Sequence, residues 1–198
     1  MCQFIETIKV QNKELQNITY HNLRFNKTRK DFLTLKEFVD LKQVIQIPDN
    51  LDNKIYKCRI IYSETINKVE FLPYKIKPVS TLQIIADDLI DYSYKFLDRT
   101  CFEKLFKEIK TDDILIVKNG YITDTSFSNI AFFDGIKWLT PLKPLLYGTK
   151  LSFLINNNQI YFEELQIKDL KKFKEAKLIN ALLDLEDSPS ILIKNIIY

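Results

Sequence analysis

Glycine is scarce in this chain. Only Gly120, Gly135 and Gly148 occur among 198 residues. Glycine-rich phosphate loops, such as the P-loop and the dinucleotide fingerprint, need several closely spaced glycines so that the backbone can approach the phosphates. The sequence therefore excludes both kinds of nucleotide site.

Histidine and cysteine are scarce as well. The chain has one histidine, His21, and three cysteines, Cys2, Cys58 and Cys101, none of them in CxxC spacing. A structural zinc site takes four nitrogen or sulfur ligands and would use up all four of these side chains. We therefore expect no metal site. The odd number of cysteines favours a reducing, cytoplasmic location.

Long apolar runs and a strong net charge are also missing. No apolar run approaches the length of about 18 residues that a membrane-spanning helix needs, and the N-terminal segment alternates instead of forming a signal-peptide core. The 29 basic and 26 acidic residues leave a net charge of only +3, spread along the chain. This balance favours a solvated surface, so we expect neither a membrane nor a nucleic-acid partner.

The first part of the chain, residues 1–78, has the pattern of a small N-terminal α+β domain. Alternation predicts a strand over 4–10, and apolar residues at helical spacing predict one or two helices over 21–41. Stretches rich in β-branched and aromatic residues predict paired strands over 54–63 and 69–77. Pro78 then opens a linker, and 79–198 would form a larger C-terminal domain.

In the C-terminal part, apolar periodicity and turn residues again set the expected elements. Residues 82–90 fit either a strand or a short helix. The other expected elements are a helix over 100–110, a buried strand over 112–117, a hairpin over 130–139, a helix over 150–155, strands over 159–162 and 176–180, and a short helix over 167–173.

An unusual polar run interrupts two good strands. Residues 120–135 read GYITDTSFSNIAFFDG, and a hairpin needs only about two to five turn residues. The run TDTSFSN instead offers a carboxylate, several hydroxyls and an amide. It is either a solvated loop, in which Asp124 is an ordinary turn residue, or a segment that holds something polar.

Several short motifs follow one another along the chain. The chain reads YKFLDR around Lys95, then GYITDTSFSNIAF, LTP, LLYGTK and LINALL, with YHNLRFNKTR and KCRIIY upstream. In this order they resemble the class IV aminotransferase family, the pyridoxal-phosphate enzymes of fold type IV, over roughly residues 4–185. The flanks of Lys95 and Asn180 are most similar to the 4-amino-4-deoxychorismate lyase branch.

The resemblance implies a fold, a cofactor and an assembly. The fold is α+β with two domains, like that of D-amino acid aminotransferase: a small N-terminal domain and a larger C-terminal domain that binds the cofactor. The cofactor is pyridoxal 5'-phosphate, the substrate is a small amine such as an amino acid or aminodeoxychorismate, and the assembly is a homodimer.

The resemblance also implies roles for individual residues. Lys95 would be the catalytic lysine, which holds the cofactor's aldehyde through its amine and moves the substrate proton. Asp124 stands where the family has a glutamate that keeps the ring nitrogen protonated. Its side chain is shorter by one C–C bond, about 1.5 Å. Charge-assisted hydrogen bonds and the backbone N–H groups at a helix start would bind the phosphate of the cofactor. The remaining cofactor-binding candidates are Arg59, Ser128, Asn129, Gly148, Thr149 and Asn180.

Three functions stay open at this point. The compact length and the lyase-like flanks favour a lyase that forms 4-aminobenzoate and pyruvate. A branched-chain or D-amino acid aminotransferase would use the same lysine and acid. A non-catalytic relative that kept the fold is the third alternative, because Asp124 replaces the family's glutamate and the N-terminal segment is shortened to Ile5-Glu6-Thr7. The family's arginine after Gly148 is also replaced, by Lys150.

Overall fold

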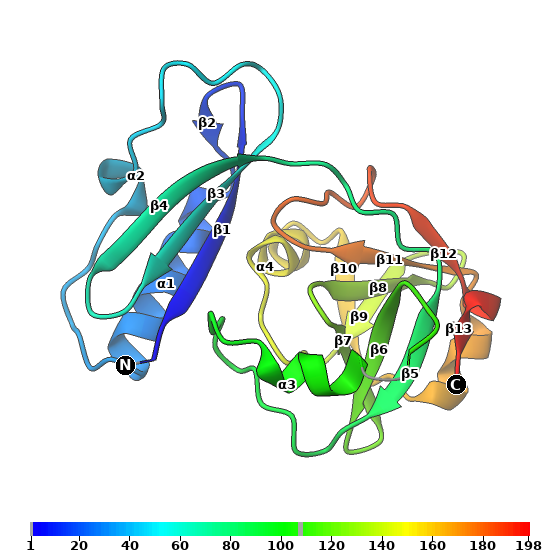
Figure 1. Ribbon diagram of the computed structural model, residues 1–198. Coiled ribbons are helices and arrows are strands. Elements are labelled where there is room, and N and C mark those ends of the chain that lie inside the picture. Colours follow the sequence, from blue (N-terminus) through cyan, green and yellow to red (C-terminus); the bar gives the residue numbers. More distant parts are fainter. Residues whose placement is uncertain (1, 107–108) are drawn as a thin grey trace. The chain divides into compact units, whose positions relative to one another are not determined.

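The computed structural model describes residues 2–106 and 109–198 (Figure 1). Contacts divide the chain into two compact units. Unit 1 holds the chain up to Ile76 together with Tyr94–Asp98, and unit 2 holds Lys77–Ser93 and Arg99–Tyr198. The segment 94–98, which the division at residue 78 placed in the C-terminal domain, therefore packs with the N-terminal unit.

Unit 1 is an antiparallel four-stranded sheet with α1 along one face (Figure 1). On β1, Phe4, Ile8 and Val10 are buried, and they form a core with Phe25 of α1 and Tyr62 of β3. The alternation seen in the sequence thus builds this core. The strands, in the order β2-β1-β3-β4, and the helices are β1 (Phe4–Gln11), β2 (Glu14–Leu15), β3 (Tyr56–Tyr62), β4 (Ile66–Pro73), α1 (Ile18–Asp31) and α2 (Leu41–Val44).

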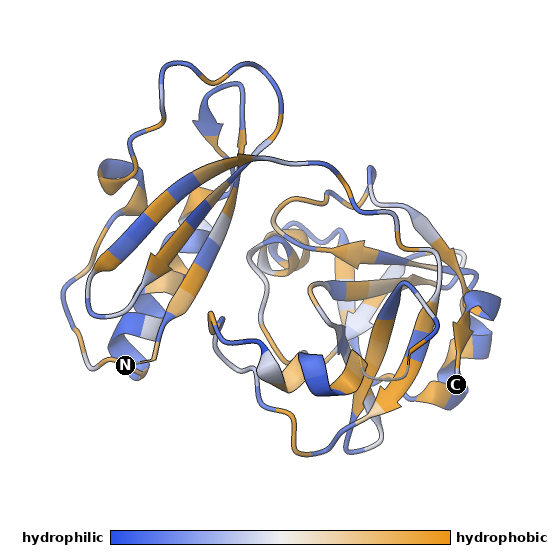
Figure 2. Cartoon of the chain, in the orientation of Figure 1, coloured by the Kyte–Doolittle hydropathy of each residue, from blue (hydrophilic) through white to orange (hydrophobic). Residues whose placement is uncertain are grey.

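Unit 2 contains two mixed sheets, ordered β10-β9-β8-β11-β12 and β13-β5-β6-β7. Strand β6 is buried nearly along its whole length and reads as an almost continuous apolar run (Figure 2). The strands of unit 2 are β5 (Leu82–Ala86), β6 (Asp113–Lys118), β7 (Tyr121–Thr125), β8 (Asn129–Phe133), β9 (Trp138–Pro141), β10 (Ile160–Glu163), β11 (Glu175–Ile179), β12 (Ser190–Leu192) and β13 (Ile196–Ile197). Its helices are α3 (Thr100–Glu103) and α4 (Thr149–Asn156), with 3-10 turns η1 (Lys104–Phe106), η2 (Ile167–Lys172) and η3 (Ile193–Asn195).

The structure changes some of the expected elements. Residues 82–90, for which the sequence allowed either a strand or a short helix, contain a strand, β5. The helix expected over 100–110 is wrong beyond its first turn: α3 ends at Glu103 and a 3-10 turn follows, while 107–108 lie outside the described residues. Among the described residues of this stretch only Phe102 is buried, so there is too little packing to extend the helix. The short helix expected over 167–173 is a 3-10 turn.

Within residues 2–106 and 109–198, no helix combines the length and the apolar character needed to cross a bilayer.

Candidate functional site

The polar run of unit 2 is buried. Residues 123–126, 128 and 129 are each at most 6% exposed. Strand β7 extends to Thr125 and β8 begins at Asn129, so only residues 126–128 form the turn. The solvated-loop interpretation therefore does not hold, because most of the polar side chains lie on strands and inside the unit.

Asp124 is a buried carboxylate held in one orientation. Its Oδ1 accepts a hydrogen bond from Nδ2 of Asn129 at 2.7 Å, and its Oδ2 accepts from the backbone N–H of Leu146 at 2.9 Å. The same amide of Asn129 also donates to the carbonyl of Leu146 at 2.8 Å. These hydrogen bonds fix the orientation of the carboxylate of Asp124.

Gly148 and Thr149 lie beside this group, at the start of α4. A Cβ at Gly148 would come within 2.1 Å of Oδ1 of Asn129, so only glycine allows the close approach. Thr149 is 3% exposed and begins an eight-residue helix, whose first N–H groups have no partner inside the helix. Lys150, which replaces the family's arginine, pairs with Asp184.

Ser128 and Asn180 meet although they are 52 residues apart in the sequence. Nδ2 of Asn180 donates to Oγ of Ser128 at 2.8 Å, while Oδ1 of Asn180 accepts from the N–H of Leu182 at 2.8 Å. Unit 2 thus brings together six of the predicted residues: Asp124, Ser128, Asn129, Gly148, Thr149 and Asn180.

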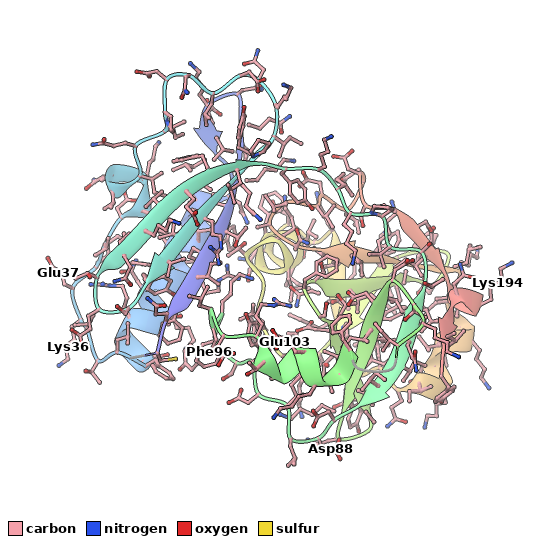
Figure 3. All side chains as sticks on the ribbon, viewed as in Figure 1. Lys36, Glu37, Asp88, Phe96, Glu103 and Lys194 are labelled. Carbon is pink, nitrogen blue, oxygen red and sulfur yellow. The ribbon has the colours of Figure 1, made fainter. Side chains whose placement is uncertain are left out.

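Lys95 belongs to unit 1, where its main chain is fixed to the edge of β1. The N–H of Ile5 donates to the carbonyl of Lys95 at 2.9 Å, and the N–H of Leu97 donates to the carbonyl of Gln3 at 2.8 Å. Phe96, labelled in Figure 3, packs against Phe4 with ring centroids 5.3 Å apart. These contacts explain why segment 94–98 groups with unit 1, and they give Lys95 a defined backbone position.

A buried acid–base cluster lies in the same unit, and the sequence analysis did not connect its acidic member, Glu6, with His21 and Arg24. The carboxylate of Glu6 is fully buried and accepts from Nε and Nη2 of Arg24 at 2.8 and 2.6 Å, and Nδ1 of His21 lies 2.6 Å away. Burial raises the pKa of Glu6, but the charge and hydrogen bonds of Arg24, with those of His21, outweigh it and lower this pKa to about 2.

His21 has the opposite response to burial. Burial is the largest influence and lowers the pKa of His21, the hydrogen bond and charge of Glu6 raise it, and the charges of Arg24 and Lys95 lower it, so that this pKa lies below its usual value. We infer that the imidazole is neutral at pH 7 and donates from Nδ1 to Glu6. One signal in the sequence could have found this cluster: alternation puts Glu6 between Phe4 and Ile8 on the apolar face of β1, where a charged residue needs a partner.

Arg59 lies on β3 of unit 1. Its Nη1 is 3.1 Å from Oε2 of Glu70, and Nζ of Lys68 lies 2.6 Å from the other oxygen of the same carboxylate. Arg59 is therefore engaged in an ion pair on the sheet, and its binding of a phosphate stays a prediction.

The fold and the buried polar cluster of unit 2 can be compared with known proteins. The sequence model of the amino-transferase class IV family matches residues 93–185. An uncharacterized protein of Haemophilus influenzae is 34% identical over 185 residues, which are 92% of this chain and 98% of that protein. The crystal structure of a putative 4-amino-4-deoxychorismate lyase from Haemophilus somnus is 32% identical, with a TM-score of 0.85 over 93% of this chain and 98% of that chain.

A more distant structure shares the fold. The pyridoxal-phosphate-bound form of a hypothetical aminotransferase from Mycobacterium tuberculosis is 15% identical, with a TM-score of 0.71 over 96% of this chain and 80% of that chain. Together these likenesses define an α+β enzyme fold of the D-amino acid aminotransferase type, which confirms the expected fold class. The chain belongs to the class IV aminotransferase family, whose enzymes use pyridoxal phosphate.

Proposed function

We propose that this enzyme is a 4-amino-4-deoxychorismate lyase, which converts its substrate to 4-aminobenzoate and pyruvate. The observation that carries the proposal is the likeness over nearly the whole length of both chains to the putative lyase from Haemophilus somnus. The lyase-like flanks of Lys95 and Asn180 agree with it. We further propose that it acts in the cytoplasm as a homodimer.

The residues of unit 2 fit the cofactor chemically. The carboxylate of Asp124 is buried, and hydrogen bonds from Asn129 and the N–H of Leu146 fix it, as suits an acceptor for a protonated ring nitrogen. The start of α4 at Thr149 offers backbone N–H groups of the kind that bind phosphate, and glycine at position 148 keeps the backbone close to Asn129. Ser128, Asn129 and Asn180 supply further polar groups at the same place.

Two residues would carry the chemistry. The ε-amine of Lys95 would hold the cofactor and then take a proton from the substrate carbon that bears the amine. Asp124 would keep a proton on the ring nitrogen. Pyridoxal phosphate, when bound, supplies an electron sink for the pair released at that carbon. Arg59 would bind the phosphate only if its guanidinium shared, or gave up, its ion pair with Glu70.

The assignment of Lys95 can be tested without any substrate. Wild-type protein mixed with pyridoxal phosphate should develop a visible absorption band, and borohydride reduction should leave one phosphopyridoxyl group on the peptide that contains Lys95. Lys95→Ala should abolish both signals. Lys118→Ala is the matched control, since Lys118 is also half-buried and its Nζ donates to the carbonyl of Ile90. A band that survives in the Lys95 variant would assign the cofactor to another lysine.

The reaction requires a separate test. Pyruvate released from aminodeoxychorismate can be followed with lactate dehydrogenase, and wild type should produce it at a rate that Lys95→Ala lowers at least about a thousandfold. A branched-chain or D-amino acid aminotransferase would share the same lysine and acid. Turnover of a panel of amino acids with 2-oxoglutarate, without pyruvate release from aminodeoxychorismate, would reject the lyase and establish the aminotransferase.

A further inference from the structure

Arg99 has an unusually constrained side chain. Its guanidinium carbon lies 4.8 Å from the ring centroid of Phe102 and 5.9 Å from that of Tyr92. The two rings are 3% and 4% exposed and meet edge to face at 4.8 Å. Flat guanidinium groups stack well on aromatic faces, so the two buried rings limit the orientations that Arg99 can adopt.

The guanidinium makes one short hydrogen bond within unit 2. Nη2 of Arg99 donates to the backbone carbonyl of Ser126 at 2.7 Å. Ser126 is 5% exposed and lies in the turn between β7 and β8, outside both strands. A buried carbonyl needs a donor, and a charged donor makes a stronger bond than a neutral one.

The turn that Arg99 holds is tightly closed. The N–H of Thr125 donates to the carbonyl of Ser128 at 2.9 Å, and the N–H of Ser128 donates back to Oγ1 of Thr125 at 3.2 Å. A displacement of Ser126 would therefore move Ser128. That residue accepts from Asn180 through its hydroxyl and is followed by Asn129, which holds the carboxylate of Asp124.

We propose that Arg99 is a positioning residue, which fixes the Asp124–Ser128–Asn129 group for the cofactor by holding the carbonyl of Ser126. The inference rests on the proposed binding of pyridoxal phosphate. This role does not require Arg99 to touch cofactor or substrate.

The test compares two variants of Arg99 with a matched control. Arg99→Met keeps apolar contact with the rings but removes the donor, and Arg99→Lys keeps a charge without the flat stacking group. Arg29 supplies the control: it also lies over a phenylalanine, 5.5 Å from the ring of Phe25, and its Nη1 donates to the carbonyl of Glu64 at 3.0 Å, but in unit 1. Arg29→Met therefore removes the same kind of bond elsewhere.

Two readouts separate positioning from general destabilisation. The dissociation constant of pyridoxal phosphate, measured from the visible band, should rise about tenfold or more in Arg99→Met and less in Arg99→Lys. Amide hydrogen exchange at Ser128 in the cofactor-free protein should become faster in Arg99→Met. Arg29→Met should change neither value, even if it lowers the melting temperature as much.

The outcomes are distinguishable. A wild-type protein that fails to bind pyridoxal phosphate overturns the proposed function, whereas Ser128 exchange still reports on Arg99. A folded Arg99→Met with wild-type affinity and wild-type exchange overturns the positioning role and leaves the function standing. If Arg99→Met does not fold, Arg99→Lys decides: reduced affinity supports the inference, and an affinity within twofold of wild type refutes it.

Discussion

Replacing Glu6 by glutamine should destabilise unit 1 in a strongly pH-dependent way. The variant keeps the size of the side chain but removes the negative charge between Arg24 and His21. The pKa of Glu6 falls from 4.5 to about 2 on folding, a difference that corresponds to about 3 kcal/mol at neutral pH. Removing one member of a buried ion pair typically lowers the free energy of unfolding by about 3–5 kcal/mol. The value obtained from the pKa shift of Glu6 agrees with this range.

The pH dependence follows from the sign of this shift. A carboxyl whose pKa is lower in the folded state stabilises the fold above its unfolded pKa of 4.5, and this contribution is lost as the pH falls towards 2. The Glu6→Gln variant lacks that contribution at every pH. The difference in unfolding free energy between wild type and variant should therefore be about 3 kcal/mol at pH 7 and small near pH 2.

The assay is urea unfolding at several pH values, followed by circular dichroism. Trp138, the only tryptophan in the chain, lies in unit 2, so its fluorescence monitors that unit separately. Glu70→Gln is the matched control, because Glu70 also pairs with an arginine but lies at the surface of the sheet, where such a pair contributes little. A loss below about 1 kcal/mol at pH 7, or an equal loss at pH 7 and pH 3, would refute the reasoning.

Three further predictions concern single buried groups. Burial raises the pKa of Asp113, and hydrogen bonds from Ser126, the N–H of Ile114 and Thr125 offset this only in part, so its ionisation opposes folding as the pH rises. Asp113→Asn should therefore stabilise the protein by about 1 kcal/mol at pH 8 but not below pH 4, measured by thermal unfolding. Gly148→Ala should push Asn129 off Asp124, cost about 2 kcal/mol and weaken cofactor binding, and unchanged binding would contradict the contact. Burial raises the pKa of Cys58 to about 12, so iodoacetamide at pH 8 should label exposed Cys2 and spare Cys58.

Much of the fold could be predicted from local patterns. Alternation on β1 predicted its buried face, and the apolar run of β6 predicted a buried strand, because burial of a strand depends on side chains two residues apart. The prediction of a helix over 100–110 was wrong beyond the first turn, because local spacing does not report on tertiary packing. Its apolar spacing was helical, but a helix of this length depends on tertiary packing, and only Phe102 is buried there among the described residues.

The candidate site shows a similar division. Motif order was enough to assign the chain to its family, whereas the roles that it predicts for Lys95 and Asp124 stay predictions. Burial of the polar run was not predictable, since hydroxyls and a carboxylate fit a solvated turn equally well until their partners are known.

The sequence by itself determined the class of protein: few glycines, no long apolar run, and an ordered set of short motifs that the family shares. Only the tertiary structure decided which side chains meet, as in Glu6 with Arg24, Ser128 with Asn180, and Arg99 with Ser126. The physical reason is that periodicity reports on neighbours a few residues apart. A hydrogen bond between distant residues depends instead on how packed strands and turns orient two particular groups to within a few tenths of an ångström.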